Sequence, residues 1–444
     1  MFTRKFLPVL LLSGLSFSSQ AQTLNKAKLD SLLTALSTHD KAMGSLTISQ
    51  NGAVVYSRAI GYETLSDATK IPATPATHYR IGSVSKMFTA TMILQLVEEG
   101  KLALTTPLAT YFPQLPNAKT ITVEHLLNHR SGLHSFTSDA AYASYLSQPK
   151  TQAEMLMLIG QAAPDFEPGT KFAYSNSNYV VLGYLVEKLT KQTYAQALQK
   201  RIASKARLQD TYYGGKIGQK PSEASSYRYA GTWQPATETD MSIPGGAGAV
   251  VSTPADLDRF VEALFAGKLI SDKSLARMKT MTDGYGLGML QMPLGTKRAY
   301  GHTGGIDGFA SMLTYFPEDK LAVAYVSNGQ NYPLNDIMLG VLTICFQQPY
   351  RLPDFNQVSI TLPAEELTQY AGTYASTQMP LKIKVTAEGT TLQAQATGQP
   401  ALPLTPVAKN VFTFDAAGIR LEFAPARREM VLKQGAGTYL FTLE

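Results

Sequence analysis

The chain has 444 residues, 44% apolar and 16% charged, with a formal net charge of +6. This length predicts two to three domains, and the apolar and aromatic content excludes a mainly disordered protein. The single cysteine, Cys345, excludes an intramolecular disulfide framework and any multi-cysteine metal or iron–sulfur site, and basic residues in no run beyond pairs argue against nucleic-acid binding.

The first residues have the pattern of an export signal. Arg4 and Lys5 precede an apolar run over 6–15, and Ser19-Gln20-Ala21 is a small-x-small cleavage site. No later stretch of about 18 apolar residues follows, so no membrane-spanning helix is expected. We therefore expect residues 1–21 to be a signal peptide and the protein to be periplasmic or secreted.

The next 330 residues predict strands at both ends with helices between them. A polar-faced helix is expected over 23–38, before strands at 45–49 and 54–60 that Asn51-Gly52 joins as a hairpin. Residues 84–280 are mainly helical in pattern. Strands return at 298–302, 310–315 and 321–326, before a helix over 333–346. This order predicts an α+β fold, an antiparallel sheet flanked by terminal helices with a helical insertion.

Composition changes after residue 350. Arg351-Leu352-Pro353-Asp354 is typical of a linker, and the sequence beyond it alternates apolar and polar residues between turns. The expected strands contain Leu381 to Val385, Leu392 to Ala396, Phe412 to Phe414 and Ile419 to Phe423. We therefore expect a domain over 22–350 and a second, small all-β barrel or sandwich over 355–444.

A serine and a lysine three residues apart open the long helix that is expected to run to Glu99. The positive N-terminus of a helix stabilises negative charge on Ser83, whereas the dipole and burial lower the pKa of Lys86, which favours a lysine base. The alternative is a helix cap beside a surface lysine. A second copy, Ser147 to Lys150, is broken by Pro149, and a new helix is expected at a Thr151/Glu154 capping box.

Two further motifs carry polar groups suited to catalysis. Tyr174 follows a Glu-Pro-Gly-Thr turn and precedes Asn176, whose side-chain amide is able to orient a substrate carbonyl. The alternative interpretation of Tyr174 is an aromatic residue that anchors the loop. His302-Thr303-Gly304-Gly305 ends a strand, where small residues allow a backbone N–H to face an oxyanion. His302 alone is equally typical of a structural histidine.

The histidines do not predict a metal site. His125 and His129 have helical spacing with His134 nearby, but no carboxylate completes a metalloprotease pattern. We expect neither a metal nor a cofactor.

Taken together, these ordered motifs resemble the class C β-lactamase and serine D-alanyl-D-alanine carboxypeptidase family (peptidase S12 type). The resemblance covers roughly residues 24–350 and includes flanking stretches at 126–133, 166–178, 233–242 and 285–288. Residues 355–444 resemble the β-rich extension of some of these hydrolases. The resemblance implies the β-lactamase/DD-peptidase fold.

The resemblance also implies a role for each matching residue. Ser83 would be the acylated nucleophile, with Lys86 and Tyr174 as a general-base pair, and the backbone N–H groups of Ser83 and Gly305 would form the oxyanion hole. Substrate contacts would come from Asn176 at the acyl amide, from Trp233 as a pocket wall or else a core residue, and from His302 and Thr303 along the strand edge.

Two departures from the family pattern bear on the substrate. His302 stands where β-lactamases usually have lysine, which makes efficient β-lactamase action less expected. Met289-Leu290-Gln291 stands where related carboxypeptidases have an arginine for the substrate carboxylate, and Lys297 or Arg298 are the candidates to replace it.

The expected function is that of an exported serine hydrolase. Its substrates are expected to be D-amino-acid peptides or amides, as in D-Ala-D-Ala carboxypeptidases, with β-lactam binding in addition. The alternatives are a carboxylesterase of the same fold and a non-hydrolytic sensor of β-lactams or peptidoglycan. Expected partners are a small-molecule or peptide substrate and peptidoglycan, but no nucleic acid.

Overall fold

An antiparallel sheet joins the two ends of the first 350 residues. The computed structural model describes residues 24–356, 359–379, 381–399, 401–414, 419–434 and 437–444, so the expected signal peptide lies outside the described residues. The sheet has the order β10-β11-β12-β13-β1-β2, and β7 and β8 extend it beside β13. The strands are β1 (Ala42–Gln50), β2 (Ala53–Ile60), β7 (Tyr227–Tyr229), β8 (Trp233–Pro235), β10 (Leu290–Leu294), β11 (Lys297–Ile306), β12 (Phe309–Phe316) and β13 (Leu321–Gln330).

The hairpin expected at Asn51-Gly52 is confirmed. Both residues have positive φ, +54° and +82°, as a type I′ turn requires. The turn pairs β1 with β2, and β1 also pairs with β13, so the first strand of the chain closes against the last strand of the sheet.

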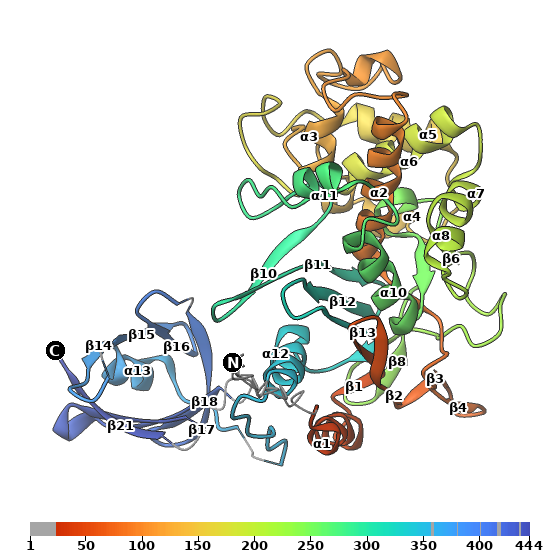
Figure 1. Cartoon of the computed structure of the whole chain (residues 1–444). Helices are drawn as coiled ribbons and strands as arrows, with labels where there is room; N and C mark the ends of the chain where they lie inside the picture. Colours follow the sequence, from red (N-terminus) through yellow and green to blue (C-terminus); the bar gives the residue numbers. More distant parts are fainter. Residues whose placement is uncertain (1–23, 357–358, 380, 400, 415–418, 435–436) are drawn as a thin grey trace, which may run out of the picture.

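Helices cover both faces of this sheet (Figure 1). The helices α1 (Lys26–Thr38) and α12 (Leu334–Cys345) share one apolar cluster with Val323 and Tyr325 of β13. On the other face, α10 (Pro254–Phe265) packs on β13 and β1, and the alternate residues Ala322, Ala324 and Val326 join the larger core. The expected α+β architecture with terminal helices is therefore confirmed.

The helical insertion is built around α2 (Ser85–Glu98). Its residues from Ser85 to Leu96 are all buried, as expected for a central helix. The capping box of Thr151 and Glu154 begins α5, also as expected. The other helices are α3 (Val123–Leu127), α4 (Tyr142–Tyr145), α5 (Gln152–Gln161), α6 (Asn176–Thr190), α7 (Tyr194–Leu198), α8 (Ser204–Ala206), α9 (Gly245–Gly248) and α11 (Asp272–Met278), with short strands β3 (Tyr62–Leu65), β4 (Lys70–Pro72), β5 (Tyr79–Arg80), β6 (Tyr212–Tyr213) and β9 (Val250–Ser252).

The C-terminal residues form a closed barrel of eight strands (Figure 1). After α13 (Ala364–Leu367), its strands are β14 (Gly372–Ala375), β15 (Lys382–Glu388), β16 (Thr391–Ala396), β17 (Leu402–Ala408), β18 (Val411–Phe414), β19 (Ile419–Ala424), β20 (Glu429–Gln434) and β21 (Gly437–Leu443). Phe412 and Phe441 are fully buried in its core. The barrel and its strands β15, β16, β18 and β19 were expected, but β14, β17, β20 and β21 were not. In β17, Pro403 and Pro406 interrupt the usual strand pattern.

Candidate active site

Ser83 lies in a tight turn that touches the edge of the sheet. It belongs to the 3₁₀ turn η1 (Gly82–Val84) directly before α2, rather than to the first turn of that helix. Gly82 has a φ of +49°, and a Cβ there would stand 2.8 Å from the nitrogen of Gly305. A Cβ at Gly304 would be 2.1 Å from the oxygen of Ile81. These glycines let η1 and β11 meet, which brings the backbones of Ser83 and Gly305 together.

The Lys86 amine is held by oxygen atoms from three parts of the chain. Its Nζ lies 2.8 Å from Ser83 Oγ, 2.8 Å from Asn176 Oδ1 and 2.8 Å from the carbonyl oxygen of Ala247. Lys86 is fully buried, and this burial lowers its pKa well below the usual value. The spacing of Ser83 and Lys86 in the sequence therefore does produce a direct contact.

The three partners fit a neutral amine. An uncharged amine has two N–H donors and one lone pair, and the oxygens of Asn176 and Ala247 only accept. In the neutral form the remaining lone pair would accept from the Ser83 hydroxyl, the one partner that carries a proton to give. The contact thus brings a buried amine against a serine hydroxyl.

Sequence patterns did not reveal the Ala247 carbonyl. The segment Gly245–Gly248 has the composition of a bend or packing feature. It does pack tightly, because a Cβ on Gly246 would be 2.6 Å from the backbone carbonyl oxygen of Tyr179 in α6. The same close packing delivers the Ala247 oxygen to Lys86. A backbone carbonyl leaves no side-chain signature, so only the tertiary structure identifies it.

Asn176 links the lysine to the outer wall of the site. As the first residue of α6, it accepts from Lys86 through Oδ1, and its Nδ2 donates to Thr137 Oγ1 at 2.9 Å. Its backbone N–H donates to Ser135 Oγ at 3.1 Å. Both ends of the amide are therefore fixed from within the protein.

Tyr174 lies across the lysine, above a buried histidine. Lys86 Nζ is 5.0 Å from the centre of the Tyr174 ring, and the ring of His129 lies 4.3 Å from it, centre to centre. Tyr174 is 39% exposed, yet burial raises the pKa of its phenol, and the neighbouring Ser83 opposes that rise. The phenol is therefore protonated at neutral pH.

His129 supports this ring, a role that its sequence context does not indicate. Its Nδ1 accepts from the Ser175 N–H at 3.1 Å, and burial lowers its pKa well below the usual value. A neutral, buried His129 thus fixes the backbone next to Tyr174. His134 instead pairs with Asp165 and Asp139 at the surface. Among the residues that the structure describes, no group of three histidine, cysteine or carboxylate side chains is placed to hold a metal.

His302 is buried behind the strand edge. Its Nε2 is 3.0 Å from the Tyr285 hydroxyl, and burial lowers its pKa to about 3. The pocket beside Ser83 is lined by Gly305 but by neither His302 nor Thr303. The structure thus places His302 as a neutral buried group rather than at the pocket surface.

Trp233 is not brought to the pocket. Its Nε1 donates to Asp40 at 3.2 Å, and a Cβ on Gly329 would be 3.0 Å from its ring. Trp233 lies on β8 at the edge of the sheet extension, beside Tyr229. The proposed pocket wall is formed instead by Phe136, Thr137, Tyr142 and Leu146.

The pocket at Ser83 has a volume of about 260 Å³ and two charged lining residues, Arg228 and Asp307. The carboxylate of Asp307 already has partners within the protein, because it accepts hydrogen bonds from Thr239 Oγ1 at 2.6 Å and from the buried Arg80 at 2.8 Å. Within the described part of the chain, Arg228 forms no ion pair, so it is the cation available to a ligand.

The two cations expected near the pocket lie elsewhere. Lys297 pairs with Asp319 at 2.7 Å, and Lys297 and Arg298 stand at the opposite end of β11 from Gly305. Arg228 reaches the site because the turn between β11 and β12 packs against β7, the strand that carries Arg228. A Cβ on Gly308 in this turn would be 2.3 Å from the backbone carbonyl oxygen of Tyr227. No local motif marks Arg228.

Comparison with known proteins gives a consistent result. The sequence matches the Beta-lactamase protein family over residues 29–340. It is 27% identical to a penicillin-binding protein of Bacillus subtilis over 90% of this chain and 94% of that protein. It is also 27% identical to the teichoic acid D-alanine hydrolase of Staphylococcus aureus over 64% of this chain and 70% of that protein.

Among solved structures, a D-amino acid amidase from Ochrobactrum anthropi SV3 aligns with a TM-score of 0.61 and 30% identity, covering 68% of this chain and 91% of its own. No helix in the described part of this chain is long and apolar enough to cross a membrane. Since the family match covers well over half of its length, the chain belongs to the beta-lactamase family of hydrolases.

Proposed function

We propose that this protein is an exported serine hydrolase that forms an acyl-Ser83 intermediate with D-amino-acid peptides, amides or esters. The observation that carries the proposal is the contact of 2.8 Å between Ser83 Oγ and the buried amine of Lys86. The names of the similar proteins, which refer to D-amino acid amides and to D-alanine on teichoic acid, support this class of acyl donor. The apolar N-terminal run supports export.

Acylation begins with proton transfer between the two residues. Neutral Lys86 accepts the proton of Ser83 as Oγ attacks the substrate carbonyl carbon. The resulting oxyanion faces the backbone N–H groups of Ser83 and Gly305. Collapse breaks the bond to the leaving group and leaves an ester on Ser83.

Tyr174 supplies the second proton transfer. Because burial keeps its phenol protonated, it donates a proton to the leaving nitrogen or oxygen and is reprotonated from the lysine. Hydrolysis then follows when water, deprotonated at the Tyr174–Lys86 pair, attacks the ester. This division gives the base role to Lys86 and the acid role to Tyr174 in the first step.

A carboxylesterase is the alternative within the same fold. The buried, neutral His302 leaves the strand edge without the cation of a typical β-lactamase lysine, which is compatible with ester substrates. A non-hydrolytic sensor is less compatible, since Ser83 and Lys86 are in direct contact. Turnover measurements separate these three activities.

Covalent labelling tests the nucleophile. Incubation with a fluorescent penicillin, a D-alanyl ester and a p-nitrophenyl ester is expected to add the mass of one acyl group, mapped by mass spectrometry to the peptide that contains Ser83. Ser83→Ala removes the adduct, whereas Ser147→Ala, the serine of the second Ser-x-x-Lys copy, keeps it. Turnover that survives Ser83→Ala would falsify the mechanism.

The lowered pKa of Lys86 predicts the pH dependence of acylation. The amine must be deprotonated to act, so the rate rises with pH through the lysine pKa and is level above it. Since burial lowers that pKa, the rise is expected well below about 10.4, the usual lysine value. Stopped-flow acylation by a neutral ester measures the profile, and Lys86→Ala is expected to lose about 10²- to 10⁴-fold in rate. A rise centred near the ordinary lysine pKa would contradict a neutral base.

The contact between η1 and β11 predicts a sensitive glycine. Gly304→Ala places a Cβ against Ile81 O and 3.0 Å from Ser83 N, which pushes the two oxyanion donors apart. Losing one such donor costs about 10²- to 10³-fold in kcat. The acylation rate is compared with that of Gly160→Ala, where a Cβ finds no atom closer than 3.7 Å. Equal rates for both variants, with unchanged thermal stability, would argue against this oxyanion hole.

Arg228 predicts a preference for substrates that carry a negative charge. With Asp307 engaged by Arg80 and Thr239, the pocket offers a cation and no comparable carboxylate. Arg228→Gln is expected to raise KM about tenfold for a peptide with a free carboxylate and to leave the matching C-terminal amide unchanged, since one charged hydrogen bond contributes about 1.5 kcal/mol. Steady-state kinetics on the matched pair, with Arg228→Lys as the conservative control, provides the measurement. An equal change in KM for both peptides would show that Arg228 does not bind the substrate carboxylate.

A further inference from the structure

A second hollow lies away from Ser83. It has a volume of about 770 Å³ and is formed where four separate segments meet: the β1–β2 turn, the end of β12 with the turn after it, α10, and the residues around α8. The strand β12 has eight residues, and its Phe309 end lies beside the Gly305 edge of the Ser83 pocket, whereas its Phe316 end leads to the hollow. A strand of this length spans about 25 Å, so the hollow and the pocket are separate sites.

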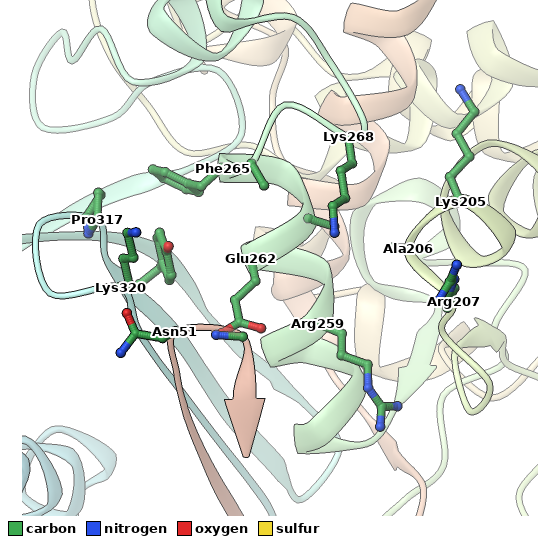
Figure 2. Close-up of a pocket in the computed structure, with 14 residues that line it drawn as sticks. Asn51, Lys205, Ala206, Arg207, Arg259, Glu262, Phe265, Lys268, Pro317 and Lys320 are labelled. Atoms are coloured by element: carbon green, nitrogen blue, oxygen red, sulfur yellow. The ribbon is translucent and has the colours of Figure 1, made fainter. Parts of the chain in front are cut away.

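Five basic side chains line this hollow, against one carboxylate. They come from segments far apart in the sequence, namely Lys205, Arg207, Arg259, Lys268 and Lys320. Figure 2 shows Lys320 and Asn51 at one end, Arg207 at the other, and Glu262, Lys268 and Arg259 of the α10 segment between them. The positive charges therefore follow the length of the hollow instead of converging on one point.

Most of these cations lack an ion-pair partner among the described residues, although Lys205 attracts Glu98 and Lys268 attracts Glu262 at longer range. Arg259 pairs with Asp256 at 3.0 Å, but in the described part of the chain Lys205, Arg207, Lys268 and Lys320 form no ion pair. By contrast, Arg58, Arg130 and Arg201, none of which lines the hollow, each pair with a carboxylate.

The lone carboxylate is turned to the protein itself. Glu262 Oε1 accepts from the backbone N–H of Gly52 at 3.2 Å, and burial raises the pKa of its carboxyl group. It therefore ties α10 to the β1–β2 turn, while Lys268 and Arg259 oppose the rise in its pKa. With one carboxylate against five cations, the lining keeps an excess of positive charge.

The wall of the hollow is apolar between the cations. Phe265 and Tyr315 pack with their ring centres 4.7 Å apart, and Ala263, Ala266 and Pro317 continue this surface. A surface of this kind accommodates carbon segments, while separated ammonium and guanidinium groups bind tetrahedral anions. The combination fits a chain in which short carbon units alternate with phosphates.

We propose that this hollow is a second binding site, which holds a flexible polyol-phosphate chain while Ser83 acts elsewhere on the same or another molecule. Binding is expected to involve no covalent step. Its affinity is expected to fall with rising salt, because each phosphate neutralised by a lysine or arginine releases condensed counterions.

A binding experiment with a charge-matched control tests this site. The probe is a short, fluorescently labelled glycerol phosphate oligomer, titrated by fluorescence anisotropy at several salt concentrations against the full protein bearing Ser83→Ala, which removes hydrolysis. Combining Lys268→Glu with Lys320→Glu is expected to weaken binding at least tenfold and to lower the salt slope by about one for each lysine lost. The control is Lys384→Glu with Lys409→Glu, two exposed lysines on the barrel that change the net charge equally.

Each other outcome has a defined meaning. Equal weakening by the two double variants would reveal general attraction to a basic protein and overturn the site. If inorganic phosphate bound as tightly as the oligomer, the claim that the site holds a chain would be wrong. If polyglutamate bound as tightly as the oligomer, the claim that the site selects phosphate groups would be wrong. Unchanged ester hydrolysis by Lys268→Glu with Lys320→Glu, in the protein with intact Ser83, verifies the fold and keeps this test independent of the proposed acyl transfer.

Discussion

The buried amine of Lys86 is the constraint on which the catalytic region depends. A lysine inside a protein must either lose its charge or find partners, because transfer from water disfavours the ammonium strongly. Here three oxygens surround it, one each from η1, α6 and α9. Moving any of these elements would remove one of the three partners, so the packing that satisfies the amine also fixes the position of Ser83.

Close backbone contacts make that arrangement rigid. η1 touches β11 through Gly82 and Gly304, and α9 touches α6 through Gly246. A buried charge, Arg80, fixes the far side of the site, donating to Asp307, to Glu238 at 2.5 Å and to the carbonyl of Thr239. Removing one member of such a buried pair costs about 3–5 kcal/mol, since the other charge stays behind unpaired. The pocket is thus held in place by backbone contacts and by the buried ion pairs of Arg80.

The two remaining parts of the molecule have different physical tasks. The barrel closes its eight strands on themselves, which leaves no open sheet edge for unwanted pairing. The basic hollow, by contrast, keeps several charges unpaired at the surface, where they repel one another. Such a charge arrangement costs stability and becomes favourable when an anion is bound.

The sequence by itself determined the features that depend on near neighbours. The hairpin at Asn51-Gly52, the cap at Thr151, the contact of Ser83 with Lys86 and four of the barrel strands all follow from turn chemistry or from periodicity over a few residues. Three motifs in order also indicated the family. The roles of the expected substrate residues remain predictions, because residue type alone does not say which way a side chain faces.

Only the tertiary structure decided which distant groups meet. The carbonyl of Ala247 has no sequence signature, and His129 lies under Tyr174 solely because two loops pack together. Arg228 enters the pocket through the contact of Gly308 with β7. In the sequence the basic residues appear scattered, and folding brings five of them from three segments around one hollow. The physical reason is the same in each case: these contacts join residues far apart in the chain, and their proximity is set by the packing of whole elements.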